Sequence, residues 1–169
     1  MTVQEGALEF AFPGVGDVIR LDAQDRARPQ GMALVDFVVE EAERTLLIEV
    51  KDPSGASVPA SEQVQYVKRL QTNQLIHDEL TPKARDSYTF LHLMARDNKP
   101  CLFVVLFGLD AIAHDPAILL AFKDRLLQRI RRETDEPWKR HYVSDCVVLT
   151  LASWAKYFPV FRVKRTTAI

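Results

Sequence analysis

The sequence predicts an α/β (mixed α+β) domain in which one central mixed β-sheet is flanked by helices. Two β-like runs, residues 33–40 and 45–51, come early in the chain. Two apolar runs typical of buried strands, residues 101–108 and 146–152, come later, with helix-like segments between them. Strands first, and then helices that alternate with buried strands, are typical of a single sheet covered by helices.

Composition limits the class of protein. The chain has 169 residues, 47% of them hydrophobic and 27% charged, which suits one domain over residues 1–169 with a sizeable core. The start, MTVQEGALEF, lacks the features of a signal peptide, and the longest apolar run is too short to cross a bilayer. We therefore expect a cytoplasmic protein with no membrane partner. Cys101 and Cys146 lack metal-ligand spacing and are expected to be buried free thiols.

Charged residues are segregated along the chain. Residues 1–80 contain 7 Lys and Arg against 14 Asp and Glu, whereas residues 81–169 contain 15 against 9. This division suits a face that binds a polyanion, although a fold that interleaves the two halves would remove it. The histidines form no zinc-like pair, and no GxxxxGKS, GxxxxGKT or GxGxxG motif indicates ATP or NAD binding.

The N-terminal segment predicts a hairpin followed by a loop. Residues 8–12, LEFAF, alternate apolar and polar or small side chains, residues 13–16, PGVG, predict a turn, and residues 17–23 resume a β-like run. Residues 22–31 contain Pro and Gly among polar residues and predict a loop before the strand at 33–40.

Helical spacing and capping signals predict the remaining elements. Apolar residues at helical spacing predict a helix over 64–80, and the Thr-Pro pair at 81–82 predicts the start of another that runs to about residue 97. The Asp-Pro pair at 115–116 predicts a third helix start. Aromatic residues in 154–165 recur at helical spacing and are expected to pack.

The hairpin at 33–51 brings two acids together. If a two- or four-residue loop within EAER joins the strands, paired positions sum to 85 and Asp36 faces Glu49. The pleat then places Asp36, Glu49 and Lys51 on one side, and a three- or five-residue loop would separate the acids. The other side is expected to be the core, formed by Val35, Phe37, Val39, Leu46, Ile48 and Val50.

The repulsion between two opposed carboxylates must be offset by another group. Directly opposed residues have Cβ atoms roughly 4.5–5.5 Å apart, and like charges in such a pair destabilise a sheet. A shared proton could supply it, but a divalent cation does so at neutral pH without a proton. Mg²⁺ at this point would leave positions open for phosphate oxygens, while Lys51 stabilises developing charge or orients a water. The residues therefore indicate hydrolysis of a phosphodiester.

The spacing from Asp36 across twelve residues to Glu49-Val50-Lys51, inside a strand-turn-strand unit, resembles the PD-(D/E)xK nuclease superfamily. The resemblance covers residues 33–152 and implies a restriction-endonuclease-like fold and a Mg²⁺-dependent nuclease, with Mn²⁺ as a substitute. It implies that Asp36, Glu49 and the Val50 carbonyl bind the metal and that Lys51 is the catalytic cation.

Three positions depart from the family pattern. Val35 stands where the name-giving proline occurs, a substitution that removes no ligand. The family commonly supplies another acid from a preceding helix, and here the preceding segment is β-like and offers Glu5, Glu9, Asp17 or Asp22. The Gln-x-x-x-Tyr spacing of the RecB-like branch of the superfamily is not present, since Gln63 lies three residues before Tyr66 and not four.

Basic residues outside the motif are candidates for nucleic-acid binding. Lys68 beside Arg69 on one predicted helix, and Lys83 with Arg85 at the start of the next, could hold phosphates. A further stripe, which could follow a nucleic-acid backbone or form an ordinary charged outer face, consists of Arg125, Arg129 and Arg132.

DNA is the expected substrate, although no residue distinguishes DNA from RNA or internal from terminal cleavage. A homodimer or a partner protein is expected on mechanistic grounds, since one such site cuts one strand. The alternative function is a catalytically silent nuclease-fold module that binds nucleic acid or protein.

Overall fold

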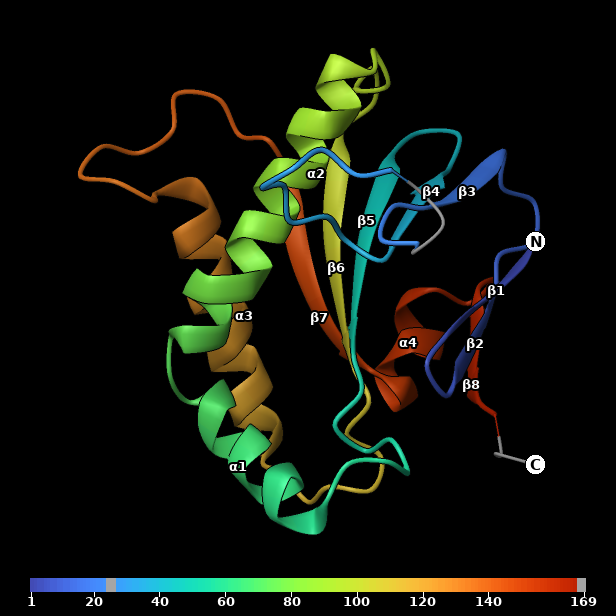
Figure 1. Ribbon diagram of the computed structural model, residues 1–169, viewed down its shortest axis with the longest axis vertical. Helices are drawn as coiled ribbons and strands as arrows, with labels where there is room; N and C mark the ends of the chain where they lie inside the picture. The colour runs from blue at the N-terminus through green and yellow to red at the C-terminus, as the bar shows by residue number, and fades with distance from the viewer. Residues whose placement is uncertain (24–26, 167–169) are drawn as a thin grey trace.

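The computed structural model of the chain, which describes residues 1–23 and 27–166, is built around a five-stranded mixed sheet of order β3-β4-β5-β6-β7 (Figure 1). Strands β3, β4 and β5 are antiparallel, and β5, β6 and β7 are parallel. Their bounds are Asp17–Arg20, Phe37–Glu40, Thr45–Lys51, Cys101–Phe107 and Asp145–Thr150. The predicted mixed α+β class is confirmed.

Helices cover one face of this sheet (Figure 1). They are α1 (Ala60–Leu70), the π-helical turn η1 (Ile76–Leu80), α2 (Thr81–Leu93) and α3 (Pro116–Arg131). Leu91 of α2 and Phe122 of α3 belong to the same buried cluster as Val38, Leu47 and Phe103 of the sheet. Hydrophobic burial thus fixes the helical layer on the side of the sheet that carries Val38 and Leu47.

A smaller sheet and a short helix cover the other face (Figure 1). The small sheet has the antiparallel order β1-β2-β8, with bounds Thr2–Glu5, Leu8–Ala11 and Arg162–Arg165, and α4 spans Leu151–Tyr157. The rings of Phe10 and Trp154 meet edge to face with centroids 5.7 Å apart, and both pack with Phe37 and Ile48. Both faces of the central sheet are therefore core, which explains why every residue of β6 is buried.

Burial on both faces corrects one expectation for the hairpin. Only the side containing Phe37 and Ile48 was expected to be core, yet Val38 and Leu47 on the opposite side are fully buried under the helices. Val35 also packs on the helical side, because the chain before β4 turns toward α2.

The predicted N-terminal hairpin is wrong. Residues 8–11 pair with β1 and with β8, and residues 17–20 pair with β4, so PGVG connects two sheets instead of closing a hairpin. Burial of Leu8, Phe10 and Phe12 against α4 and β4 gives the physical reason. Residues 24–26 of the predicted 22–31 loop lie outside the described residues.

The predicted helix over 64–80 is interrupted. Thr72 Oγ1 donates to the Arg69 carbonyl at 2.9 Å and accepts the Gln74 amide at 3.4 Å, and these local bonds compete with the backbone ladder where α1 ends. Thr81 is not an N-cap, since it has helical dihedrals and joins η1 to α2. The wider π turn before Pro82 relieves the crowding that a proline ring causes in a regular helix.

Other local predictions are confirmed. The Asp115 side chain accepts a hydrogen bond from the Ala117 amide at 2.9 Å and caps α3 at Pro116. Cys101 and Cys146 are free and buried. Among residues 1–23 and 27–166, no helix has the length and apolar character needed to span a membrane.

Candidate metal centre

The β4-β5 hairpin has the predicted register. Phe37 pairs with Ile48 and Val38 with Leu47, which is the register in which Asp36 would face Glu49, although the ladder itself ends at Phe37. Alternation along the strands places both acids on the side covered by helices. Asp36 is 5% exposed and Glu49 is 1% exposed, so the two carboxylates lie in the protein interior and not on a solvated edge.

Two hydrogen bonds to side chains replace the backbone pairing of β4 and β5 beside Asp36. The Asp36 Oδ2 atom accepts the Val50 amide at 2.6 Å, and the Val35 amide donates to the Ser87 hydroxyl of α2 at 2.9 Å. The last ladder pair is therefore Phe37 with Ile48. Because the Val35 amide bonds to α2 and the Asp36 side chain replaces a backbone partner of β5, the two strands separate where the acids lie.

Lys83 of α2 reaches both acids. Its Nζ atom lies 2.6 Å from Glu49 Oε1 and 3.8 Å from Asp36 Oδ1. Lys83 and Ser87 are four residues apart, so one face of α2 supplies both the ammonium group and the acceptor for Val35. Lys83 was a candidate for holding a substrate phosphate, and its ammonium group lies beside both predicted metal ligands.

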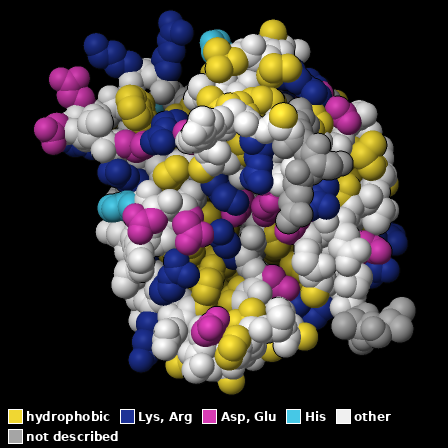
Figure 2. All heavy atoms as spheres, viewed as in Figure 1, with side chains coloured by type: hydrophobic (Ala, Val, Ile, Leu, Met, Phe, Trp, Pro, Cys, Tyr) yellow, Lys and Arg dark blue, Asp and Glu magenta, His cyan; other side chains and the backbone are white. Residues whose placement is uncertain are grey.

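Lys51 lies beside Glu49 at the end of β5. Its Nζ atom is 3.0 Å from Glu49 Oε1 and 2.7 Å from Glu79 Oε2, and Glu79 also binds Arg69 at 3.0 Å. Burial alone would lower the pKa of Lys51, but the Glu49 and Glu79 carboxylates outweigh burial and raise it above its ordinary value. Lys51 therefore retains its proton. Figure 2 shows basic and acidic side chains gathered at the centre of this face.

The structure brings two of the four candidate acids to Asp36. Carboxylate oxygens of Glu5, Asp22 and Asp36 lie within 4.8 Å of one another. The other two candidates have surface partners, since Glu9 pairs with Lys164 at 2.8 Å and Asp17 pairs with Arg96 at 3.0 Å. Glu5 ends β1 of the small sheet, and this strand was not predicted, so no sequence pattern singled out Glu5.

Burial and crowding of like charges raise the pKa of Asp36 and of Glu5. Burial raises the pKa of Asp36 and the Glu49 carboxylate raises it further, to about 8, although Lys83 and the Val50 amide oppose the rise. Burial and the Asp22 carboxylate likewise raise the pKa of Glu5 against the effect of Arg20. Without a metal, the Lys83 ammonium group and the proton that Asp36 keeps below about pH 8 thus offset the crowding of negative charge.

The donor set fits a hard divalent cation. Asp22 Oδ1 and Glu49 Oε2 are buried without a hydrogen-bond partner in the described part of the chain. Buried acceptors of this kind are costly unless something binds them. Carboxylate oxygens are the preferred ligands of Mg²⁺ and Mn²⁺, so the orphaned atoms and the three-acid cluster could hold such an ion.

The remaining basic candidates lie in different environments. Lys68 is exposed on α1. Arg85 pairs with Glu133 and, at 3.2 Å, with Asp86. Arg125 donates to the carbonyls of Leu70 and Thr72 and to Asn73, while Arg129 and Arg132 donate to carbonyls that follow α3. These three arginines connect loops to α3, yet their partners are uncharged oxygens.

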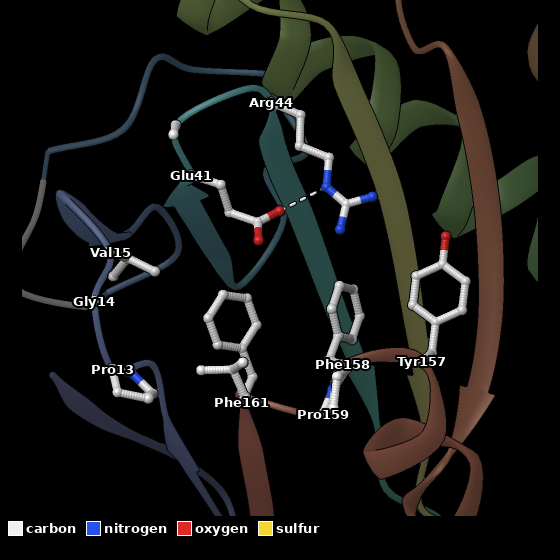
Figure 3. Close-up of a pocket in the computed structure, with 11 residues that line it drawn as sticks. Pro13, Gly14, Val15, Glu41, Arg44, Tyr157, Phe158, Pro159 and Phe161 are labelled. Carbon is white, nitrogen blue, oxygen red and sulfur yellow. Dashed lines mark hydrogen bonds and ion pairs between the residues drawn. The ribbon is translucent and has the colours of Figure 1, made fainter.

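A separate hollow of about 390 Å³ lies among residues of the opposite core (Figure 3). Phe158, Phe161 and Pro159 line it, together with the Glu41–Arg44 ion pair of 2.6 Å at the β4-β5 turn. It contains a single acid, so it lacks the convergent carboxylates of the candidate metal centre.

Comparisons with known proteins gave no match, whether to a family model, to a curated protein or to a solved structure.

Proposed function

We propose that the chain is a metal-dependent nuclease of the PD-(D/E)xK kind, with a restriction-endonuclease-like fold and DNA as its substrate. The observation that carries this proposal is the convergence of Asp36, Glu49 and Lys51 on one side of the central sheet. Both carboxylates approach the same Lys83 ammonium group, and Lys51 lies 3.0 Å from Glu49. Had the hairpin register been shifted by one residue, the acids would lie on opposite faces.

Asp36 and Glu49, assisted by Glu5 and Asp22, would hold Mg²⁺ or Mn²⁺ through their carboxylate oxygens. A bound ion would polarise a phosphate oxygen and lower the pKa of a water molecule. The Val50 carbonyl remains the predicted further ligand, and the Val50 amide already orients Asp36 through its 2.6 Å hydrogen bond.

The chain's own residues bind and position the reacting groups. Lys51 keeps its proton at neutral pH, so it can donate hydrogen bonds but cannot act as a base. We assign it the stabilisation of negative charge on a phosphate oxygen while water adds to phosphorus. The phosphorus–oxygen bond to the leaving group then breaks, the attacking water loses a proton to solvent and the leaving oxygen takes one from solvent, which yields a phosphomonoester and an alcohol. Lys83 holds the two acids at a common point.

The position of Lys83 beside Glu49 also favours a second function, that of a catalytically silent binding module. An ammonium group 2.6 Å from Glu49 compensates the acids without any metal, as a catalytically silent module for nucleic-acid or protein binding would require. Calorimetry with Mn²⁺ separates the two functions. Heat of binding that disappears in Glu49→Gln supports the nuclease, and absence of heat in the parent protein supports the module.

The direct test is cleavage. Plasmid, linear and single-stranded DNA, and RNA, are incubated with the protein and Mg²⁺ or Mn²⁺, beside Asp36→Asn, Glu49→Gln and Lys51→Met purified identically. Each substitution is expected to reduce the rate by about 10²- to 10³-fold, the effect of removing one group that stabilises transition-state charge. Activity that survives all three substitutions would refute the proposal.

Three of the four acids that the sequence offered as a further ligand provide two test substitutions and one matched control. Glu5→Gln and Asp22→Asn should lower cleavage, because their carboxylates lie within 4.8 Å of Asp36. Glu9→Gln removes the same charge from a surface ion pair with Lys164 and should leave the rate unchanged. Equal effects of Glu5→Gln and Glu9→Gln would contradict the assignment of Glu5 to the site.

A further inference from the structure

Glu79 bridges two cations that belong to different elements. Its Oε2 atom lies 2.7 Å from Lys51 Nζ, and its Oε1 atom lies 3.0 Å from Arg69 Nη2. Lys51 ends β5, Arg69 lies in the last turn of α1, and Glu79 belongs to η1. One carboxylate thus joins a strand, a helix and a π turn beside the candidate metal centre.

The arrangement resembles a bound phosphate. Each carboxylate oxygen of Glu79 takes one cation, as two non-bridging oxygens of a phosphate group do when lysine and arginine share them. Lys51 also contacts Glu49, so an anion in the position of the Glu79 carboxylate would adjoin the proposed metal ligands.

The two cations line a hollow. Its volume is about 520 Å³, within the range of small-ligand sites, and it lies between α1 and the segment that follows β5. Tyr66 lines this hollow, and its buried hydroxyl has no partner among the residues that the structure describes. Asp52 and Glu62 also line it. The hollow is therefore lined by two cations and two acids, with the Tyr66 hydroxyl group buried in its wall.

The Glu79 contacts are accessible to solvent. The side chain of Glu79 is 37% exposed and that of Arg69 is 38% exposed, so water screens their ion pair and its rupture costs little. Lys51 is only 19% exposed, but it keeps its 3.0 Å contact with Glu49 when Glu79 leaves. Glu79 lies on a π turn, a form that occurs frequently at functional sites. An incoming anion can thus replace the Glu79 carboxylate without unfolding a core element.

We propose that Lys51 and Arg69 form a binding site for a nucleic-acid phosphate, and that Glu79 occupies this site as a competing anion when no substrate is bound. The nucleic-acid identity of the ligand rests on the proposed function, whereas the competition rests on the contacts of Glu79. Removal of the Glu79 charge should strengthen nucleic-acid binding, and removal of Arg69 should weaken it.

The test measures binding without cleavage. Fluorescence anisotropy of labelled single-stranded and duplex DNA is recorded in EDTA over a series of salt concentrations. We expect Glu79→Gln to tighten binding about two- to fivefold, the range of a part-exposed ion pair. We expect Arg69→Ala to weaken binding and to reduce the salt slope by about one, as loss of a phosphate contact does. In the Arg69→Ala background, Glu79→Gln should have a smaller effect.

Glu62→Gln is the matched control. Glu62 lines the same hollow and is exposed, but it forms no ion pair within the described ranges, so its substitution measures the general effect of losing a negative charge. Equal effects of Glu79→Gln and Glu62→Gln overturn the proposal, as does an unchanged salt slope in Arg69→Ala. Thermal melting of every variant checks folding.

The outcomes distinguish this inference from the proposed function. Loss of cleavage in Asp36→Asn together with no effect of Glu79→Gln on binding would retain the nuclease and remove the competing anion. Tighter binding by Glu79→Gln without cleavage under any metal condition would retain the phosphate site and remove the nuclease.

Discussion

The Lys83 ammonium group lies 2.6 Å from Oε1 of Glu49, a carboxylate that is 1% exposed. The same Nζ atom is 3.8 Å from Asp36, so a helix residue compensates two buried acids that the hairpin brings together. A charge so deeply buried is tolerated only when it is paired, which makes Lys83 a stability determinant as well as a positioning residue.

Lys83→Met should destabilise the metal-free protein by about 2 kcal/mol. This is less than the 3–5 kcal/mol typical of an uncompensated buried charge, because Lys51 still contacts Glu49 at 3.0 Å. Urea unfolding in EDTA measures the change. Mn²⁺ should recover part of the loss, since a cation bound only by the native state adds to its stability.

Lys164→Met is the control for this substitution. Lys164 pairs with Glu9 on the surface, and its side chain is 69% exposed, so the loss should stay below about 1 kcal/mol. Equal stability losses in Lys83→Met and Lys164→Met would show that Lys83 does not compensate the buried acids.

Ser87→Ala should also destabilise the protein. The substitution removes the acceptor of the Val35 amide, and a buried donor without a partner costs about 1–3 kcal/mol. The free energy of unfolding from urea titration provides the measurement, with Ser61→Ala at an exposed position of α1 as control. No loss in Ser87→Ala would mean that water or another group satisfies the Val35 amide.

Gly108→Ala should be more disruptive than Gly16→Ala. A Cβ atom at Gly108 would lie 2.2 Å from Asp52 Oδ1, whereas at Gly16 the nearest atom is 3.9 Å away. Asp52 binds Arg165 through two hydrogen bonds of 2.8 and 2.9 Å, so the clash would also disturb the contact between β8 and the central sheet. We expect a loss of about 1–3 kcal/mol for Gly108→Ala in thermal or urea unfolding. Similar stabilities of the two variants would contradict this account.

Alkaline pH should destabilise the protein through its buried thiols. Burial, with a smaller effect of Asp97, raises the pKa of Cys101 from 9.0 to about 11, and burial with Asp145 raises that of Cys146 to about 12. The native state keeps these protons after the unfolded state has lost them. Their contribution to the free energy of unfolding is therefore constant below about pH 9 and falls as the pH rises toward 11 and 12.

Urea titrations between pH 8 and pH 12 measure this slope, which should be shallower in Cys146→Ala. A thiol reagent at pH 8 should leave both cysteines unmodified in the native protein and modify them after denaturation. Rapid modification of the native protein would show that the thiols are not buried as described.

Local patterns determined much of the fold. Period-two alternation and the short EAER turn determined the register of β4 and β5, from Glu40 with Thr45 to Phe37 with Ile48, because a hairpin of defined loop length leaves little choice of pairing. The apolar run at 101–108 predicted a strand covered on both faces, and Asp115 before Pro116 predicted a helix start. These features depend on neighbouring residues, so the sequence by itself determined them.

Only the tertiary structure decided the partners that come from distant segments. Strand β2 pairs with β8, more than 150 positions later, and this pairing displaces the expected hairpin. The fold also selects Glu5 and Asp22 among four acids, inserts Lys83 between Asp36 and Glu49, and aims Glu79 at Lys51. Contacts across layers depend on how apolar faces pack in three dimensions, and no local period in the sequence specifies them.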